Sequence, residues 1–167
     1  MDDMNELKSM IIAMAKNVVQ MTTASGSGHP SSALSLGHIV GALMGKQMRW
    51  DPKDPWDPVA DRLVLSEGHS VPVVYAAMAE LGAVMGKDKA SAEVLSCDSL
   101  SHLREIGSPL DGHPNPRVGM PFFDSATGSL GQGASTAAGV GLAARLDKSP
   151  RRVFTLIGDG ESREGQI

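Results

Sequence analysis

The sequence has a single cysteine, Cys97, which excludes a fold held by disulfide bonds. One cysteine and scattered histidines also give no zinc-ligand spacing. Basic residues are outnumbered, because 15 Lys and Arg against 19 Asp and Glu give a net charge of -4, so a primary role in binding nucleic acid is not expected. No stretch of about 18 residues lacks charged and polar side chains, so no membrane span is expected either.

Apolar side chains are plentiful, at 41% of the 167 residues, which excludes a disordered chain and fits about one domain of average size. Aromatic residues make up only 4%, so the core is expected to be mostly aliphatic. The first residues are acidic where a targeting peptide would be basic, which favours a cytoplasmic location. The chain stops shortly after a predicted strand and its turn, a pattern that we interpret as a truncation.

Helical and extended patterns alternate along the chain. Apolar residues at steps of three and four predict a helix over 4–23, and a second helix is expected to begin at Ser31 or Ser32 and run towards Met48. The other predicted elements are two buried strands over 62–66 and 152–157, helices over 73–85, 91–106 and 134–146, and a long loop over 107–127. This alternation indicates an α/β fold, with a parallel sheet flanked by helices.

The second predicted strand ends in Gly158-Asp159-Gly160. A carboxylate at the carboxyl end of a parallel strand lies at the crevice where open α/β sheets bind ligands. Asp159 is therefore a candidate ligand for Mg²⁺ or Ca²⁺ together with phosphate oxygens. Taken alone, the same three residues are more typical of a tight turn that carries a solvated aspartate than of a ligand site.

A glycine cluster over 128–133 precedes the predicted helix 134–146. Its amides could bind an anion at the positive end of the helix dipole, although glycines also serve tight helix packing, and the spacing does not match a dinucleotide-binding fingerprint. Three histidines, His29, His69 and His113, lie beside glycines in predicted loops or helix starts. Such imidazoles suit proton transfer or hydrogen bonds to sugar hydroxyls, and the alternative is that they are ordinary turn residues.

Read in order, these segments resemble the N-terminal, thiamine-diphosphate-binding domain of transketolase. The resemblance covers essentially the whole chain, so residues 1–167 are expected to form part of one such domain, incomplete at its C-terminus. The segments that carry it are Ser27-Gly28-His29-Pro30-Ser31, Asp61 to His69, Gly112-His113-Pro114, Thr127 to Gly133, Gly158-Asp159-Gly160 and Glu164-Gly165.

The resemblance implies a binding site for thiamine diphosphate and a divalent metal, Mg²⁺ or alternatively Ca²⁺ or Mn²⁺. Asp159 would bind the metal that bridges the diphosphate, and Gly160 would contact the diphosphate itself. Gly128 and Leu130 would line the cofactor site, and His69 would reach the diphosphate side.

The resemblance also implies catalytic roles. His29 and His113 would face the hydroxyls of sugar-phosphate substrates and, with His69, assist proton movement. Glu164 would lie at the subunit interface of a homodimer. The implied reaction moves a two-carbon ketol unit from a ketose phosphate to an aldose phosphate.

Two parts of the family's site are absent from this sequence. A second metal ligand, an Asn, follows further along the chain than Ile167, and the glutamate that activates the cofactor's pyrimidine ring belongs to another domain on the partner subunit. We therefore expect the chain alone to be inactive, to bind thiamine diphosphate poorly and to expose an apolar edge. Ser31 also replaces the glycine that is common in the family, a small change that we expect to be tolerated.

Two alternative interpretations remain. The cofactor could serve another reaction, that of 1-deoxyxylulose-5-phosphate synthase, phosphoketolase or a dehydrogenase E1 subunit. Alternatively, the chain could be a short, non-catalytic paralogue or assembly module that dimerises with a longer chain.

Overall fold

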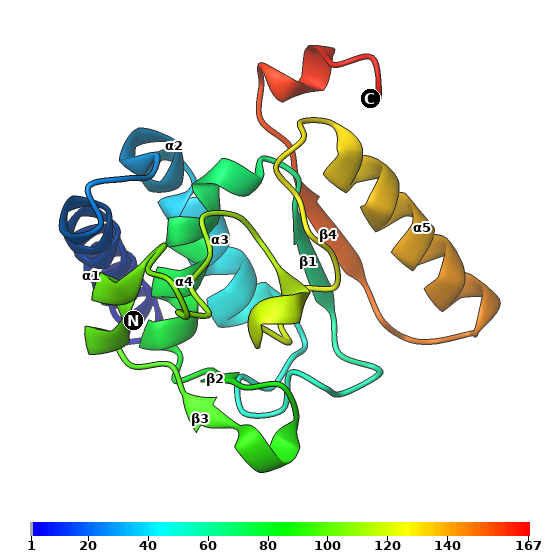
Figure 1. Ribbon diagram of the computed structural model, residues 1–167. Coiled ribbons are helices and arrows are strands. Elements are labelled where there is room, and N and C mark those ends of the chain that lie inside the picture. The colour runs from blue at the N-terminus through cyan, green and yellow to red at the C-terminus, as the bar shows by residue number, and fades with distance from the viewer. Residues whose placement is uncertain (1) are drawn as a thin grey trace.

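Two parallel strands lie at the centre of the molecule (Figure 1). The computed structural model describes residues 2–167, with side chains from residue 4 onward. Strand β1, Arg62–Leu65, pairs with β4, Val153–Leu156, in a register that sets Arg62 opposite Val153 and Leu65 opposite Leu156. Every residue of β1 is buried, as expected for a strand covered on both faces. The predicted parallel sheet is confirmed.

Helices cover both faces of this strand pair (Figure 1). Helix α5, Gln132–Leu146, lies along one face and contacts both strands. On the other side, α1, Asp2–Ala24, packs against α4, Val71–Glu80, around a core that is mostly aliphatic, as predicted. The start of α5 comes very close to β1, because a Cβ placed on Gly133 would lie 2.5 Å from Cα of Ser66.

The predicted single helix from Ser31 or Ser32 to Met48 is wrong. Pro30 is the first helical residue, and the segment is divided into α2, Pro30–Ser35, α3, Gly37–Ala42, and a π-helical turn, Leu43–Gln47. A Cβ on Gly41 would lie 2.7 Å from Cγ1 of Ile11, so the small residues of this segment allow it to pack closely on α1.

The predicted helix 73–85 ends earlier, at Glu80. Gly82 has φ +66°, and the N–H of Ala83 donates to the carbonyl oxygen of Met78 at 2.8 Å, which closes the helix with a left-handed glycine cap. The chain then forms a short strand, β2, Val84–Met85, which pairs antiparallel with β3, Glu93–Val94. This small sheet was not predicted.

The predicted helix 91–106 is also wrong, because β3 lies between two 3₁₀ turns, Lys89–Ser91 and Asp98–His102. Oδ1 of Asp88 accepts a hydrogen bond from the N–H of Ser91 at 2.8 Å. Oγ of Ser96 accepts one from the N–H of Ser99 at 3.2 Å. Short polar side chains that bond to the nearby backbone compete with a regular helix, and here they prevail.

The long loop 107–127 is confirmed and contains one 3₁₀ turn, Pro116–Val118. The hydroxyl of the buried Tyr75 donates to the carbonyl oxygen of Asp111 at 3.0 Å and so fixes the loop to α4. Desolvation by burial, together with the negative charge of Asp111, holds the pKa of Tyr75 far above its ordinary value. None of the helices over residues 2–167 is both long and apolar enough to cross a membrane.

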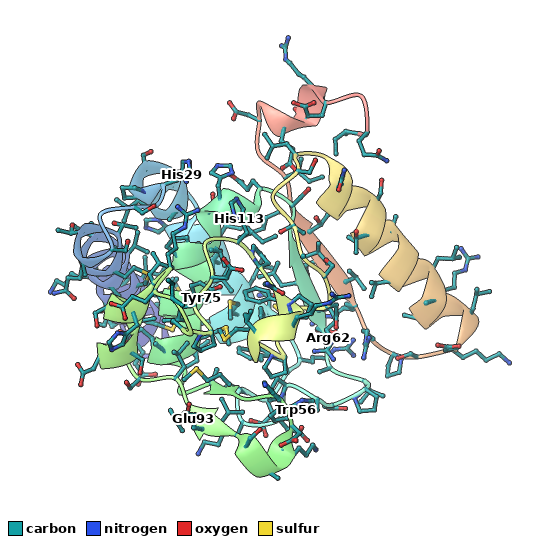
Figure 2. All side chains as sticks on the ribbon, in the orientation of Figure 1. His29, Trp56, Arg62, Tyr75, Glu93 and His113 are labelled. Carbon is teal, nitrogen blue, oxygen red and sulfur yellow. The ribbon has the colours of Figure 1, made fainter. Side chains whose placement is uncertain are left out.

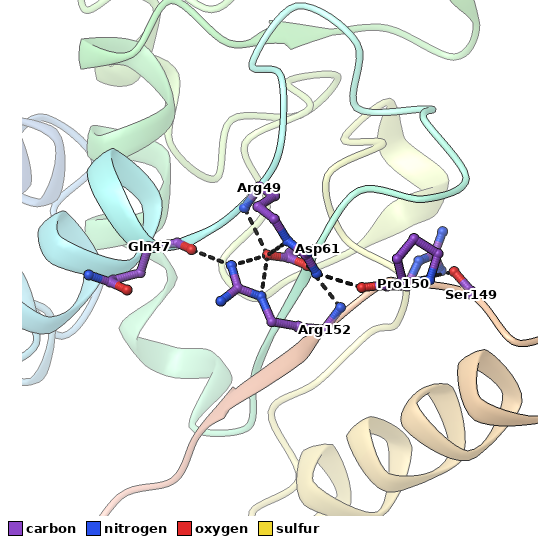
Figure 3. Close-up of polar contacts among 7 residues, drawn as sticks. Gln47, Arg49, Asp61, Ser149, Pro150 and Arg152 are labelled. Carbon is purple, nitrogen blue, oxygen red and sulfur yellow. Dashed lines mark hydrogen bonds and ion pairs between the residues drawn. The ribbon is translucent and has the colours of Figure 1, made fainter.

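The amino ends of the two strands are joined by a buried carboxylate, Asp61 (Figure 3). Its oxygens accept hydrogen bonds from the backbone N–H groups of Arg49 and Arg152, both at 2.8 Å, and from both guanidinium groups. Burial alone would raise the pKa of Asp61, but the hydrogen bonds from Arg152 and Arg49 outweigh it and hold the pKa well below its usual value. At this end of the sheet, the charge of the buried carboxylate is therefore balanced by the two arginines.

The outer surface of the sheet and α5 is apolar and open. Leu142 and Leu146 on α5 are 57% and 73% exposed, and Ile157, just after β4, is 40% exposed. Within residues 2–167, β4 pairs only with β1. The expected exposed apolar edge is thus present.

Candidate functional site

Three segments meet at the carboxyl ends of β1 and β4 (Figure 1). They are the 3₁₀ turn Gly68–Ser70 after β1, the turn 158–160 with the 3₁₀ turn Glu161–Arg163 after β4, and the glycine loop 127–131 before α5. The loop is tied to β1 because the hydroxyl of Thr127 donates to the carbonyl oxygen of Leu65 at 2.6 Å. The strands are parallel, so both carboxyl ends lie at one edge, where such sheets bind ligands.

The three predicted histidines come together beside this edge. His29 lies just before α2 and His69 in the turn after β1, and their ring centroids are 5.0 Å apart at an interplanar angle of 70°. His113 comes from the long loop, on the same side of the molecule as His29 (Figure 2). The charges of both His69 and His29 act on the pKa of His113, which places the third ring within electrostatic reach of the other two.

The pKa of His113 is lowered below its ordinary value of 6.5. Partial burial is the largest cause, followed by the positive charge of Arg104, while the charge of Asp111 opposes them. A neutral imidazole is therefore favoured at this position, and a neutral imidazole can accept a proton.

Arg104 joins the two loops that carry His29 and His113. Its Nη1 donates to Oγ of Ser27 at 2.5 Å, and its guanidinium lies so close to Gly112 that a Cβ there would be 2.0 Å from Nε. The backbone of Arg104 has φ +64°, a strained value for a residue other than glycine. The sequence offered no role for this arginine, and the structure assigns it to holding the two histidine loops together.

The glycines of the loop 127–131 allow close approach of backbone to side chain. Gly128 has φ +139°, and a Cβ on it would lie 2.6 Å from Cδ2 of His113. A Cβ on Gly68 would lie 2.8 Å from the backbone nitrogen of Gly128. Leu130, the other predicted residue of this loop, is 37% exposed. Glycine is needed at 68 and 128 so that the two turns and the His113 ring can nest together.

Asp159 and Gly160 lie at the open side of the same edge. The carboxylate of the exposed Asp159 makes no hydrogen bond or ion pair with residues 2–167, and a Cβ on Gly160 would have no atom within 4 Å. A free carboxylate beside an uncovered backbone fits a divalent cation and a phosphate group. No cluster of three or more His, Cys, Asp or Glu side chains that could hold a metal occurs in the described part of the chain. Asp159 could therefore supply only part of a coordination sphere.

Glu67 lies between His69 and the turn 158–160, and sequence reasoning gave it no role. It is 8% exposed, and its Oε2 accepts a hydrogen bond from the hydroxyl of Ser70 at 3.1 Å and lies 3.8 Å from Nε2 of His69. The same oxygen would be 3.4 Å from a Cβ on Gly158. The signal that could have revealed Glu67 is an acidic residue directly after the predicted buried strand 62–66.

Glu161 was missed altogether. It is 3% exposed and accepts hydrogen bonds from the hydroxyl of Ser66 and from the N–H groups of Gly131 and Gly158. The amide of Gly131, which the sequence offered as an anion-binding donor at the start of α5, is thus bonded to this carboxylate. Glu164 is exposed, with its Cβ close to Gly131, and the single chain leaves its predicted interface role untested.

The family model for the thiamine diphosphate binding domain of transketolase matches residues 5–166. The chain belongs to the transketolase family. The resemblance inferred from the sequence is confirmed.

Human transketolase is 45% identical to this transketolase-family chain over 150 residues, which are 89% of the chain and 22% of the human protein. A protein from Clostridium sp. (strain MSTE9) named 6-deoxy-6-sulfo-D-fructose transketolase subunit SqwG is 42% identical over 144 residues, 85% of this chain and 47% of that protein. The chain therefore spans about a fifth of the human relative and about half of the subunit.

Solved transketolases share the fold. The enzyme from Campylobacter jejuni superposes with a TM-score of 0.82 at 27% identity, covering 96% of this chain and 24% of the other. A Pichia stipitis transketolase in complex with sedoheptulose 7-phosphate gives a TM-score of 0.80 at 30% identity, with 96% and 23% covered. The thiamine-diphosphate-binding fold predicted from the sequence is confirmed.

Proposed function

We propose that this chain supplies the diphosphate-binding side of a transketolase site, which moves a two-carbon ketol unit from a ketose phosphate to an aldose phosphate. The observation that carries the proposal is the gathering of His29, His69 and His113 beside the turn that presents Asp159. Two comparisons support the proposal: the chain belongs to the transketolase family, and the related Pichia enzyme binds a ketose phosphate. Because the chain spans only part of its relatives, the activity is proposed for the complete protein.

Asp159 and Gly160 are the residues proposed to hold the metal and the diphosphate. The carboxylate of Asp159 has no partner in the described part of the chain, and the space beside Gly160 is open. Thiamine diphosphate supplies the electron sink for breaking a carbon–carbon bond, while the protein supplies geometry, charge and proton handling. Gly128 and Leu130 would line the same site, since their loop packs against His113.

The charge at this edge supports a role for a divalent metal, which we propose to be Mg²⁺. Glu67, Asp159, Glu161 and Glu164 all lie within or beside the three segments that meet there. A diphosphate alone would be repelled by these carboxylates, whereas a bound dication offsets part of their charge and offers a positive centre to the phosphate oxygens. The chemistry of the donor set thus favours a metal–diphosphate complex over a free anion.

The histidines are proposed to serve the substrate side. His113 has a lowered pKa and is poised to accept a proton, while the exposed His29 can reach a sugar hydroxyl. His69 lies between His29 and Glu67, near the proposed diphosphate position. Proton transfer by a positioned side chain typically contributes a factor of about 10²–10⁴ to a rate.

The proposal extends to assembly and place in the cell. The site is open on the side of Asp159, and the outer face of α5 is apolar, so further protein is needed to enclose a cofactor. We propose a homodimer in which Glu164 lies at the subunit interface, acting in cytoplasmic carbohydrate metabolism. The chain alone is expected to bind the cofactor poorly.

The test begins with the complete protein, purified with any polypeptide that associates with it. We expect turnover of xylulose 5-phosphate with an aldose phosphate, dependent on thiamine diphosphate and Mg²⁺, and loss of that turnover in Asp159→Asn. Turnover of pyruvate instead would identify another enzyme of the same cofactor class. Calorimetric titration of the 167-residue chain with cofactor and Mg²⁺ should show no micromolar binding.

A second candidate is a non-catalytic assembly module. It is favoured by the exposed apolar surface of α5 and by a relative that is itself named a subunit. Reading the coding DNA past Ile167 separates the two, because an open frame that continues supports the enzyme and a stop codon supports the module.

A further inference from the structure

Glu161 is a buried carboxylate at the centre of the three segments that form the site. Its Oε1 accepts hydrogen bonds from the hydroxyl of Ser66 at 2.5 Å and from the N–H of Gly131 at 2.7 Å. Its Oε2 accepts one from the N–H of Gly158 at 3.0 Å. Ser66 directly follows β1, Gly131 directly precedes α5 and Gly158 comes just after β4. One side chain thus ties together residues that are 95, 30 and 3 positions away from it in sequence.

None of these donors carries a charge, and no ion pair joins Glu161 to the part of the chain that the structure describes. A buried carboxylate without a cation is tolerated only when hydrogen bonds replace its lost hydration. Gly131 is also the N-cap residue of α5, so the carboxylate lies at the positive end of a 15-residue helix. Three hydrogen-bond donors and the dipole of α5 thus stabilise the carboxylate of Glu161 in this position.

The position of Asp159 and Gly160 depends on the same side chain. These two residues lie between Gly158, whose N–H donates to Oε2, and Glu161, which carries that oxygen. The bond closes the turn on itself and sets the direction in which Asp159 leaves the sheet. Through Oε1, the same carboxylate fixes the start of α5 and hence the loop of Gly128 and Leu130.

We propose that Glu161 is a positioning residue that sets the spacing between the turn of Asp159 and the loop of Gly128 for a metal–diphosphate group. It acts through those segments and does not itself touch the cofactor. The inference rests on the proposed function and adds to it a residue whose carboxylate is necessary for cofactor affinity. It does not depend on any change in the protonation of Glu161.

The main variant is Glu161→Gln in the complete protein. Its single amide oxygen can still accept from Ser66 and Gly131, but its amino group cannot accept from the N–H of Gly158. We expect the dissociation constant for thiamine diphosphate at saturating Mg²⁺ to rise by about tenfold or more, the usual effect of removing a residue that orients a ligand site. The turnover number at saturating cofactor should change much less. Ser66→Ala should cause a smaller rise, and the double variant should be less than additive because both changes break one network.

Two matched controls separate positioning from a general loss of stability. Arg163→Gln changes an exposed neighbour in the same 3₁₀ turn whose side chain has no partner among residues 2–167, and it should leave the affinity unchanged. Val18→Ala opens a cavity in the core beneath α1, on the other side of the strand pair from α5 (Figure 1), and lowers stability there. If Val18→Ala raises the dissociation constant as much as Glu161→Gln at equal loss of stability, the inference is overturned.

The two ways of failing can be told apart. If the wild-type protein binds no thiamine diphosphate, the proposed function and this inference both fall. If the wild type binds it and Glu161→Gln binds it equally well, only the inference falls. Hydrogen exchange of the 167-residue chain gives an independent readout, since amides of residues 128–133 and 158–160 should exchange faster in Glu161→Gln and not in Val18→Ala. Unchanged exchange there would also overturn the inference.

Discussion

Two buried carboxylates, one at each end of the same strand pair, are held in opposite ways. Asp61, before β1, is 1% exposed and receives hydrogen bonds from two arginines (Figure 3). Glu161, after β4, is 3% exposed and receives its bonds from one hydroxyl and two backbone amides. The amino end of the sheet is therefore neutralised by the chain's own cations, and the carboxyl end is not.

This difference indicates that the amino end of the strand pair is structural, whereas the carboxyl end can bind a ligand. At the amino end, Arg49 and Arg152 also bond to the carbonyl oxygens of Pro150 and Gln47, so the network is complete without a ligand. At the carboxyl end, the carboxylate of Asp159 has no partner among residues 2–167. An uncompensated acid beside open backbone is what a cation site requires, whereas a saturated ion pair leaves nothing to bind with.

The largest loss of stability should come from a substitution at the amino end of the strand pair. Asp61→Asn leaves its amide nitrogen facing donors from Arg49 and Arg152, and we expect a loss of about 2–4 kcal/mol in the free energy of unfolding. Urea denaturation followed by circular dichroism measures this loss. A change below the error of the fit would show that the network is not what holds this end together.

The same substitution has a defined pH dependence. The pKa of Asp61 in the folded chain lies below the unfolded value of about 3.9, so its stabilisation is present above that pH and is lost as the pH falls. The stability difference between wild type and Asp61→Asn should therefore shrink below about pH 4. A difference that stayed constant down to the acid transition would contradict the lowered pKa.

At the carboxyl end, Gly128→Ala should cost about 1–3 kcal/mol, because the left-handed backbone is strained for alanine and its Cβ would overlap the His113 ring. The histidine should be displaced as well. Chemical denaturation gives the stability, and the NMR shifts of the His113 ring report its displacement. An unshifted ring would mean that loop and histidine do not pack as described.

A smaller effect is expected for Arg104→Met, which removes one of the causes that lower the pKa of His113. The pKa of His113 should rise, as followed by NMR titration. Because its folded pKa lies below the unfolded value of about 6.5, His113 opposes folding as the pH drops through that value, and the variant should weaken this opposition.

Gly160→Ala should have the smallest effect on stability. The residue has φ −64° and open space around its Cβ position, so alanine is allowed and could add about 0.4–1 kcal/mol by restricting the unfolded chain. In the complete protein, the same methyl group should weaken thiamine diphosphate binding, if the diphosphate lies where we propose. Unchanged affinity would move the diphosphate away from Gly160.

Part of this comparison could be predicted from the sequence. The apolar run 62–66 and the strand before Gly158-Asp159-Gly160 indicated a parallel pair, because buried strands have a short, distinctive pattern. The three site histidines could also be picked out from the sequence, because the glycines beside them mark turns and helix starts. The helices predicted over 73–85 and 91–106 failed because Gly82 and the side chains of Asp88 and Ser96 act through specific hydrogen bonds that periodicity does not register.

The order of residues along the chain determined the strands, the long loop and the chemical types available at the site, because these follow from local periodicity and turn chemistry. Only the tertiary structure decided that Arg104 bridges two histidine loops, that Asp61 is neutralised and that Glu161 is not. Hydrogen-bond partners 30 to 95 residues away are chosen by packing, and packing depends on the whole chain at once.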